Sequence, residues 1–240
     1  MLTEMQQFTS SLVYNQVRPP KVVWSEDVQS VSVDGETLRV DKLRSGIQLA
    51  LESAWDIYNS IGGGKRYADN LPDSFSDNLP NDTHGYSFLS HGPFTRHRHA
   101  LLRYIIQDRQ LASVDSLGRL SWNIPALRRF FDALDELTGL LAFLTFILPT
   151  ISTRVTQFID SKYRNENRAR NLCMLMTEMF LLTRYHKTTN ITGLDTCLPA
   201  FFPQALQGLF LEILAGGLRD CEVLLARVLY GQQAADLYHK

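Results

Sequence analysis

The sequence RYHK, at residues 184–187, places an arginine, a histidine and a lysine within four positions, directly after an apolar run. A guanidinium group binds two phosphate oxygens at once, and a lysine or histidine beside it protonates a leaving oxygen. A second basic segment, residues 154–170, carries an excess of three positive charges in seventeen residues. The pattern is typical of a phosphate site. Charges at the ends of secondary-structure elements are also often solvated by water alone, so both interpretations stay open on the residues themselves.

Other residues that carry chemistry give weaker signals. Four histidines fall within sixteen residues, at His84, His91, His97 and His99, but arginines flank the last two and would repel a divalent cation. The three cysteines show no CxxC spacing, which favours reduced thiols over a zinc site or a disulfide framework. The hydrolase patterns GxSxG and HExxH are absent from the sequence. We therefore expect neither a metal nor another cofactor.

The first third of the chain predicts a hairpin, a helix and a loop. Residues 28–40 alternate apolar and polar on both sides of an Asp-Gly dipeptide, which favours a tight turn. Asp41 is expected to cap a helix that ends at the glycines of residues 62–64. The following GGGK lacks the spacing and the preceding strand of a phosphate loop, so we interpret it as a helix stop. Residues 67–91, rich in Asp, Asn, Pro, Ser and Gly, predict a mobile loop or linker.

The middle of the chain predicts helices. We expect one near residues 94–107, a turn at residues 115–118, and a long helix over residues 125–148 that has a proline in its first turn. Residues 137–151 carry no charge, but they fall short of the roughly 20 apolar residues that a membrane span needs. A buried helix, and no membrane anchor, is the prediction.

The last third predicts a second hairpin and two helices. Residues 172–187 fit either a hairpin or a helix, because Leu and Met favour a helix by local propensity. Residues 198–203 predict an extended entry to a helix over residues 204–214, and a further helix follows over residues 219–229. The predicted fold is mainly α (α+β), with a helical N-terminal lobe at residues 1–150 and a smaller lobe with a β-hairpin and C-terminal helices at residues 151–240.

Composition excludes a global electrostatic attraction to nucleic acid or membrane. The 240 residues have a formal net charge of -1, and 45% of them are hydrophobic, so any anion site must be a local concentration of charge. The N-terminus lacks a basic start followed by an apolar segment, which predicts an intracellular protein.

The sequence NLCMLMTEMFLLTRYHKTTNITGLDTCLPAFFPQALQGLFLEIL, from Asn171, resembles the tyrosine-recombinase-like region of fungal proteins related to Crypton mobile elements. Such regions are often joined to RecQ-type or telomere-linked helicase regions. The resemblance rests on an Arg-Asn pair at residues 170–171, the Tyr-His-Lys tripeptide at residues 185–187, Phe-Pro at residues 202–203 and the Leu-rich helix after it. It extends more weakly upstream through YSFLSH, LLRYIIQD and GRLSWN, and it implies a core-binding-like N-terminal lobe and a nuclear, DNA-binding protein.

The sequence departs from this family where catalysis would need it most. Ile151 stands where the family's first catalytic arginine is expected, and Arg154 lies one helical turn later. No His-x-x-Arg occurs in the sequence, and as it stands no nucleophilic tyrosine follows with that arginine as partner. Only Lys187 matches a catalytic position of the family cleanly. Because strand exchange needs all of these groups in one site, the resemblance implies a degenerate domain without catalytic activity.

The preferred hypothesis is a non-catalytic DNA-binding remnant that contacts phosphate without reading bases. The phosphate-binding residues would be Arg168, Arg170, Arg184, His186 and Lys187. The alternative is a helical protein-interaction module, in which the apolar stripes of residues 204–229 dock another protein. A third hypothesis, an active recombinase, requires a further segment to complete the site.

Overall fold

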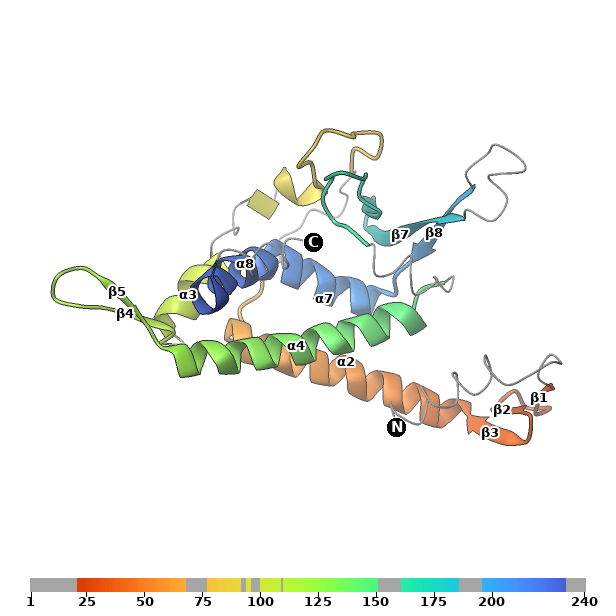
Figure 1. The fold of residues 1–240 in the computed structure, drawn as a ribbon. Coiled ribbons are helices and arrows are strands. Elements are labelled where there is room, and N and C mark those ends of the chain that lie inside the picture. The colour runs from red at the N-terminus through yellow and green to blue at the C-terminus, as the bar shows by residue number, and fades with distance from the viewer. Residues whose placement is uncertain are drawn as a thin grey trace. The chain divides into compact units, whose positions relative to one another are not determined.

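A computed structural model describes residues 21–67, 77–91, 94–95, 100–108, 110–150, 161–185 and 196–231. Within these ranges the fold is α+β, with five α-helices, one short 3-10 helix and three small antiparallel sheets (Figure 1). Contacts divide the chain into two compact units, Met1–Ala50 and Leu51–Lys240.

The first unit contains a three-stranded antiparallel sheet, β1 (Val22–Trp24), β2 (Ser30–Val33) and β3 (Glu36–Arg39). Asp34 and Gly35 both have positive φ, at 50° and 94°, as the tight turn predicted from the Asp-Gly dipeptide requires. Helix α2 (Val40–Gly62) follows directly. It begins one residue before Asp41, whose carboxylate accepts two hydrogen bonds from Arg39. The predicted hairpin and helix are therefore confirmed, and β1 is an additional strand.

The second unit continues from Leu51 through the rest of α2, which ends at Gly62 and is followed by Gly63 and Gly64, both at positive φ. Its helices are η1 (Phe88–Ser90), α3 (Ala100–Asp108), α4 (Ile124–Ile147), α7 (Gln204–Ala215) and α8 (Leu218–Tyr230). Helix α8 contacts α3, α4 and α7 (Figure 1). Leucines dominate the core among these helices, including Leu101, Leu127, Leu134, Leu137, Leu206, Leu209, Leu218 and Leu225.

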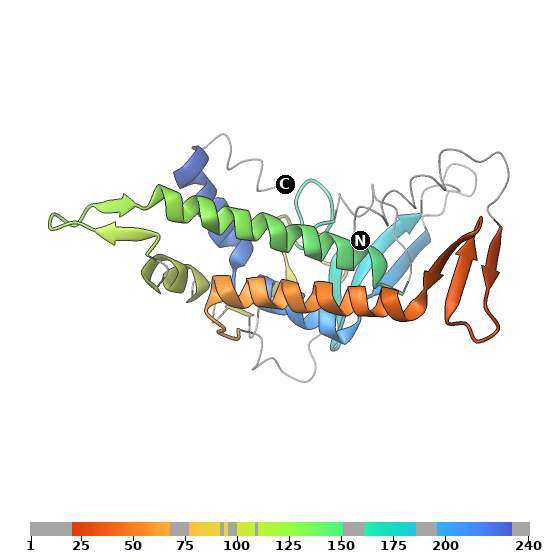
Figure 2. The same ribbon diagram turned by 90° about the horizontal axis from the view of Figure 1, so that it is seen from below.

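Local sequence signals explain the ends of α4. The side chain of Asn123 caps the helix by accepting a hydrogen bond from the Ala126 N–H at 3.2 Å, and Pro125 lies in the first turn. The hairpin of β4 (Ala112–Val114) and β5 (Leu120–Trp122) precedes it and projects from its N-terminal end (Figure 2). The turn predicted at residues 115–118 closes this hairpin. The uncharged stretch at the end of α4 buries Leu137 and Leu144 but leaves Phe146 42% exposed, so the helix predicted to be buried there is only partly buried.

Two features differ from the predictions. The expected lobe boundary near Thr150 lies inside the second unit, where Thr150 exchanges hydrogen bonds with Phe201 through its backbone N–H and its hydroxyl. Residues 77–91, predicted as part of a mobile loop or linker, pack into this unit because Asp77 and Phe88 are buried. Local composition predicted a mobile loop or linker there because it does not reveal the long-range contacts that hold the segment in place.

Candidate nucleic-acid interface

The candidate interface is built on a three-stranded sheet, β6 (Leu172–Leu175), β7 (Glu178–Tyr185) and β8 (Thr196–Phe201), in the order β6-β7-β8. Strands β6 and β7 form the hairpin that the sequence allowed as one of two structures, with Met176 at positive φ in its turn. The side chain of Gln207 on α7 accepts a hydrogen bond from the Met179 N–H and donates one to the Thr177 carbonyl. Tertiary contacts with α7 thus favour the hairpin over the helix that local propensity prefers.

The pairing of this sheet brings the basic segment to the end of β7. The Leu182 N–H donates to the Asn171 carbonyl at 2.7 Å, which extends the pairing one residue beyond β6. The Lys162 N–H donates to the side-chain oxygen of Asn171, and the Asn171 N–H donates to the Lys162 carbonyl. Since a strand rises about 3.3 Å per residue, Arg184 begins roughly 7 Å further along β7 from Leu182. Arg170, at the end of the first basic segment, is therefore one residue from Asn171, and Arg184 is two residues from Leu182, the partner of Asn171.

Arg170 has a different place from the predicted one. Its side chain is 2% exposed and its Nη2 atom lies 2.6 Å from Oδ1 of Asp77, whose side chain is fully buried. The guanidinium also donates to the carbonyls of Asn78 and Asn81 and to the side chain of Asn165. It further lies 4.5 Å from the centre of the Tyr86 ring. Because protein groups bury and occupy it, Arg170 ties residues 77–86 to the basic segment and is not placed to contact a phosphate.

The remaining predicted residues are only partly described. Arg168 is exposed, and the backbone of Arg184 pairs with Cys197 in β8, while the Arg184 side chain lies outside what the structure describes. Outside the described residues lie His186, Lys187, Ile151 and Arg154. Of the five predicted phosphate contacts, the structure thus places Arg168 on the surface and Arg170 in the core.

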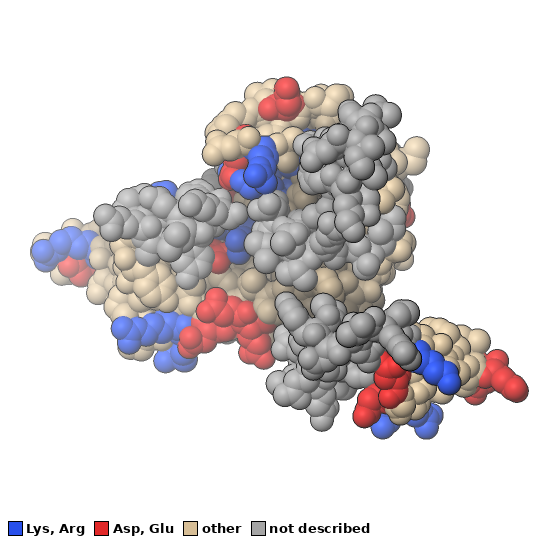
Figure 3. All heavy atoms as spheres, turned by 45° about the vertical axis from the view of Figure 1, so that its right-hand side comes forward, with Lys and Arg blue, Asp and Glu red and all other residues tan. Residues whose placement is uncertain are grey.

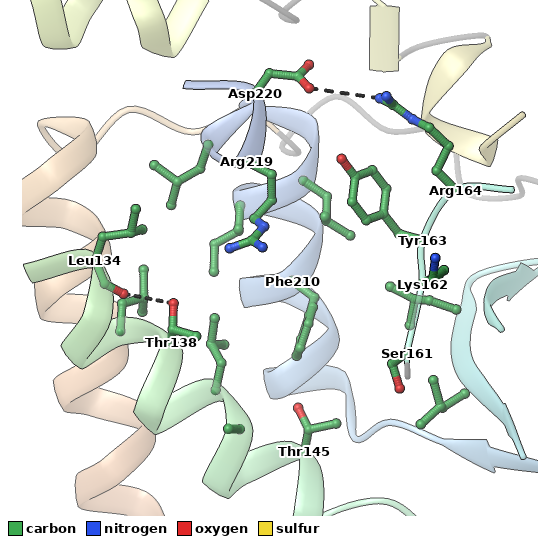
Figure 4. Close-up of a pocket in the computed structure, with 18 of the residues that line it drawn as sticks. Leu134, Thr138, Thr145, Ser161, Lys162, Tyr163, Arg164, Phe210, Arg219 and Asp220 are labelled. Carbon is green, nitrogen blue, oxygen red and sulfur yellow. Dashed lines mark hydrogen bonds and ion pairs between the residues drawn. The ribbon is translucent and has the colours of Figure 1, made fainter. Parts of the chain in front are cut away.

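A pocket of about 340 Å³, which the sequence did not predict, lies between α4, α7, α8 and residues 161–166 (Figure 4). Most of its lining is apolar: Leu134, Leu137, Leu141 and Ala142 from α4; Leu172 and Leu181 from the sheet; and Phe202, Phe210, Ile213, Leu214, Leu218 and Val223 around and within the C-terminal helices. No short motif marks the pocket, because its walls come from segments that are up to ninety residues apart in the sequence.

Charged side chains gather at one end of this pocket. Lys162 pairs with Glu166, Arg219 pairs with Glu222, and Arg164 lies 3.9 Å from Asp220. Figure 4 shows the Arg219 guanidinium pointing into the pocket, with the Tyr163 ring beside it. Burial raises the pKa of the Tyr163 phenol, and the Arg164 cation acts in the opposite direction. The phenol is therefore a neutral hydrogen-bond donor at physiological pH.

The apolar stripes of the C-terminal helices are used inside this chain. Leu206, Leu209 and Ile213 on α7 are buried, as are Leu218 and Leu225 on α8. Tyr230, which is half exposed, packs edge-on against Phe131 of α4. The interaction-module hypothesis required these stripes to be available to another protein, and most of their area is already covered.

Only part of the predicted histidine cluster lies within the described residues. His84 and His91 are described, and His97 and His99 lie outside the described residues. Over the described ranges, no three His, Cys, Asp or Glu side chains come together as metal ligands. None of the helices in those ranges combines the length and apolarity that crossing a membrane requires.

No family model matches the sequence, and comparisons with curated proteins and with solved structures find no significant match. The likeness to Crypton-related recombinases therefore rests on the sequence motifs alone.

Proposed function

We propose that this protein binds the phosphate backbone of DNA, without cleaving it, through the basic end of the β6-β7-β8 sheet. The contacts would come from Arg168 in the basic segment and from Arg184, His186 and Lys187 at the end of β7. The observation that supports the proposal is the hydrogen bond from Leu182 to Asn171, because Asn171 directly follows Arg170 and Leu182 lies two residues before Arg184.

The sequence supports binding without chemistry. Phosphoryl transfer through a tyrosine needs paired guanidinium groups to stabilise the charge that develops on the phosphate. Ile151 occupies the position of the first of these arginines in the resembling family, and His-x-x-Arg does not occur in the sequence. Contacts that only hold phosphate need fewer groups and a looser geometry, so they survive such losses.

Charge distribution limits the expected strength of binding. On the face drawn in Figure 3, basic and acidic side chains of the described residues form small interspersed groups rather than one broad basic surface. If Arg168, Arg184 and Lys187 each neutralise one phosphate, the logarithm of the binding constant should fall with the logarithm of salt concentration with a slope of about −3. This slope predicts weak, sequence-independent binding that is measurable at low salt.

The test is fluorescence anisotropy of a labelled duplex at about 50 mM and about 200 mM salt. We expect Arg184→Ala combined with Lys187→Ala to weaken binding at both concentrations and to reduce the salt slope to about −1. The matched control is Arg128→Ala combined with Arg129→Ala, because it removes two exposed cations from α4 and should leave binding unchanged.

Two results would overturn the proposal. One is the absence of duplex binding by the wild-type protein at the lower salt concentration. The other is an equal effect of the two double variants, since binding would then follow total charge and not the end of β7. Substituting a scrambled duplex should change nothing in either case, because the proposed contacts read no bases.

A further inference from the structure

We propose that the pocket between α4, α7 and α8 binds a small amphipathic anion, with an apolar body in the pocket and one carboxylate head at the charged end. This inference goes beyond DNA binding and does not depend on it. It rests on the shape of the pocket, on its apolar walls and on hydrogen-bond donors that the protein leaves unused.

The pocket has the size and lining of a ligand site. Its volume of about 340 Å³ lies at the lower end of the range of roughly 300–1,000 Å³ that is usual for small-molecule sites. Leu134 and Thr138 of α4 and Phe210 of α7 lie on different sides of the pocket (Figure 4), and Phe202 and Ile213 also line it. An apolar chain that enters the pocket would move its surface out of water and into contact with these side chains. This burial of apolar surface is the main favourable term in such binding.

Unused donors define the head-group position. A guanidinium offers five N–H donors, and the contact described for Arg219 uses Nη1 alone, with Glu222. The Nε atom of Arg164 is buried and has no hydrogen-bond partner within the described part of the chain. The 3.9 Å separation of Arg164 from Asp220 is too long for a hydrogen bond. Because the Nε atom of Arg164 has almost no surface open to solvent, the donors available to a head group are the remaining N–H groups of Arg219, whose guanidinium points into the pocket (Figure 4).

The same contacts select an anion over a cation. Glu166 accepts from Lys162, Glu222 accepts from Arg219, and Asp220 forms an ion pair with Arg164 at 3.9 Å, so a cationic head would compete with a cation already present at each carboxylate. A carboxylate instead adds acceptors where donors remain, and Arg219 can bind it while it keeps Glu222. Tyr163 also lines the pocket, and its hydroxyl provides a further donor.

The test is isothermal titration calorimetry with decanoate, decanol and decylammonium, which share one apolar chain and differ in head-group charge. We expect decanoate to bind the wild-type protein about tenfold more tightly than decanol, and decylammonium to bind most weakly. Equal affinities for the three compounds would show that the charged end selects nothing, and would refute the proposal. Binding of none of them would refute it as well.

Two variants assign the binding to this pocket. Arg219→Gln combined with Glu222→Gln removes the cation without leaving a buried carboxylate unpaired, and should reduce the preference for decanoate over decanol about tenfold. Thr138→Phe places a ring at the pocket wall, leaves every charge in place, and should weaken decanoate and decanol alike. Arg128→Gln, on an exposed part of α4 outside the pocket, is the control and should bind as the wild type does. Wild-type binding by both pocket variants, with their folds verified by near-ultraviolet circular dichroism, would contradict the assignment.

Discussion

Replacing Asp77 by asparagine should destabilise the protein strongly, although the change keeps the size and shape of the side chain. The carboxylate is fully buried and lies 2.6 Å from a guanidinium that is itself 2% exposed. Asp77→Asn leaves the charge of Arg170 buried without a counter-charge, and breaking a buried ion pair from one side costs about 3–5 kcal/mol.

The surroundings of Arg170 decide where in this range the effect falls. Its hydrogen bonds to the carbonyls of Asn78 and Asn81 and its contact with the Tyr86 ring persist in the variant, and they continue to solvate the cation. We therefore expect the lower end, about 3 kcal/mol of unfolding free energy. For a domain of this size that loss lowers the melting temperature by about 6–12 °C.

A double-mutant cycle separates this explanation from a general loss of packing. Arg170→Met alone leaves the Asp77 carboxylate buried and should be similarly harmful, but the two changes together remove both charges. In urea denaturation, the double variant should therefore lose less unfolding free energy than the sum of the losses in the two single variants. Strict additivity of the single effects would refute the buried-pair explanation.

Two further expectations concern single positions. Burial raises the pKa of the Cys173 thiol from 9.0 to about 11, so the folded state holds this proton more firmly than the unfolded state does, and the stability of the protein should fall as pH rises across this interval. In a series of thermal melts, Cys173→Ala should lessen that fall. In the native protein, a maleimide should label the exposed Cys197 before the buried cysteines. Gly63→Ala should lower the free energy of unfolding by about 1–3 kcal/mol in urea denaturation, because Gly63 has φ of 66° and its new methyl group would meet the Tyr104 hydroxyl, whereas Gly64→Ala, with similar φ and open space, should cost less.

The elements that the sequence predicted well are those set by neighbouring residues. Helix α4 has its capping asparagine, its proline and its apolar stripe within one continuous segment, so a local pattern suffices. The turn of the first hairpin needs two residues at positive φ, and Asp-Gly provides both at low cost. The hairpin of β6 and β7 was only one of two possibilities, because the side chain of Gln207 that supports it comes from a distant helix.

The features that the sequence did not predict depend on residues far apart in the chain. Asp77 and Arg170 are separated by 93 positions, and nothing near Arg170 shows that an acid is buried against it. The pocket likewise joins α4 to residues 161–166 and to α8, and each of these segments alone has an ordinary composition. Local patterns predict which residues form an element, and tertiary packing decides which charges those elements bury.

The basic segment illustrates why a run of cations does not define one function. Arg170 donates to several buried protein acceptors and is 2% exposed, whereas Arg164 borders the pocket and forms an ion pair with Asp220 at 3.9 Å. Arg168, between them in the sequence, is exposed. Within seven residues, three arginines thus occupy three different environments. Removing the charge should cost a different free energy at each of them. Counting every arginine of the segment would overestimate the charge available to a DNA phosphate. The small salt slope proposed above follows because Arg164 and Arg170 are left out of the count.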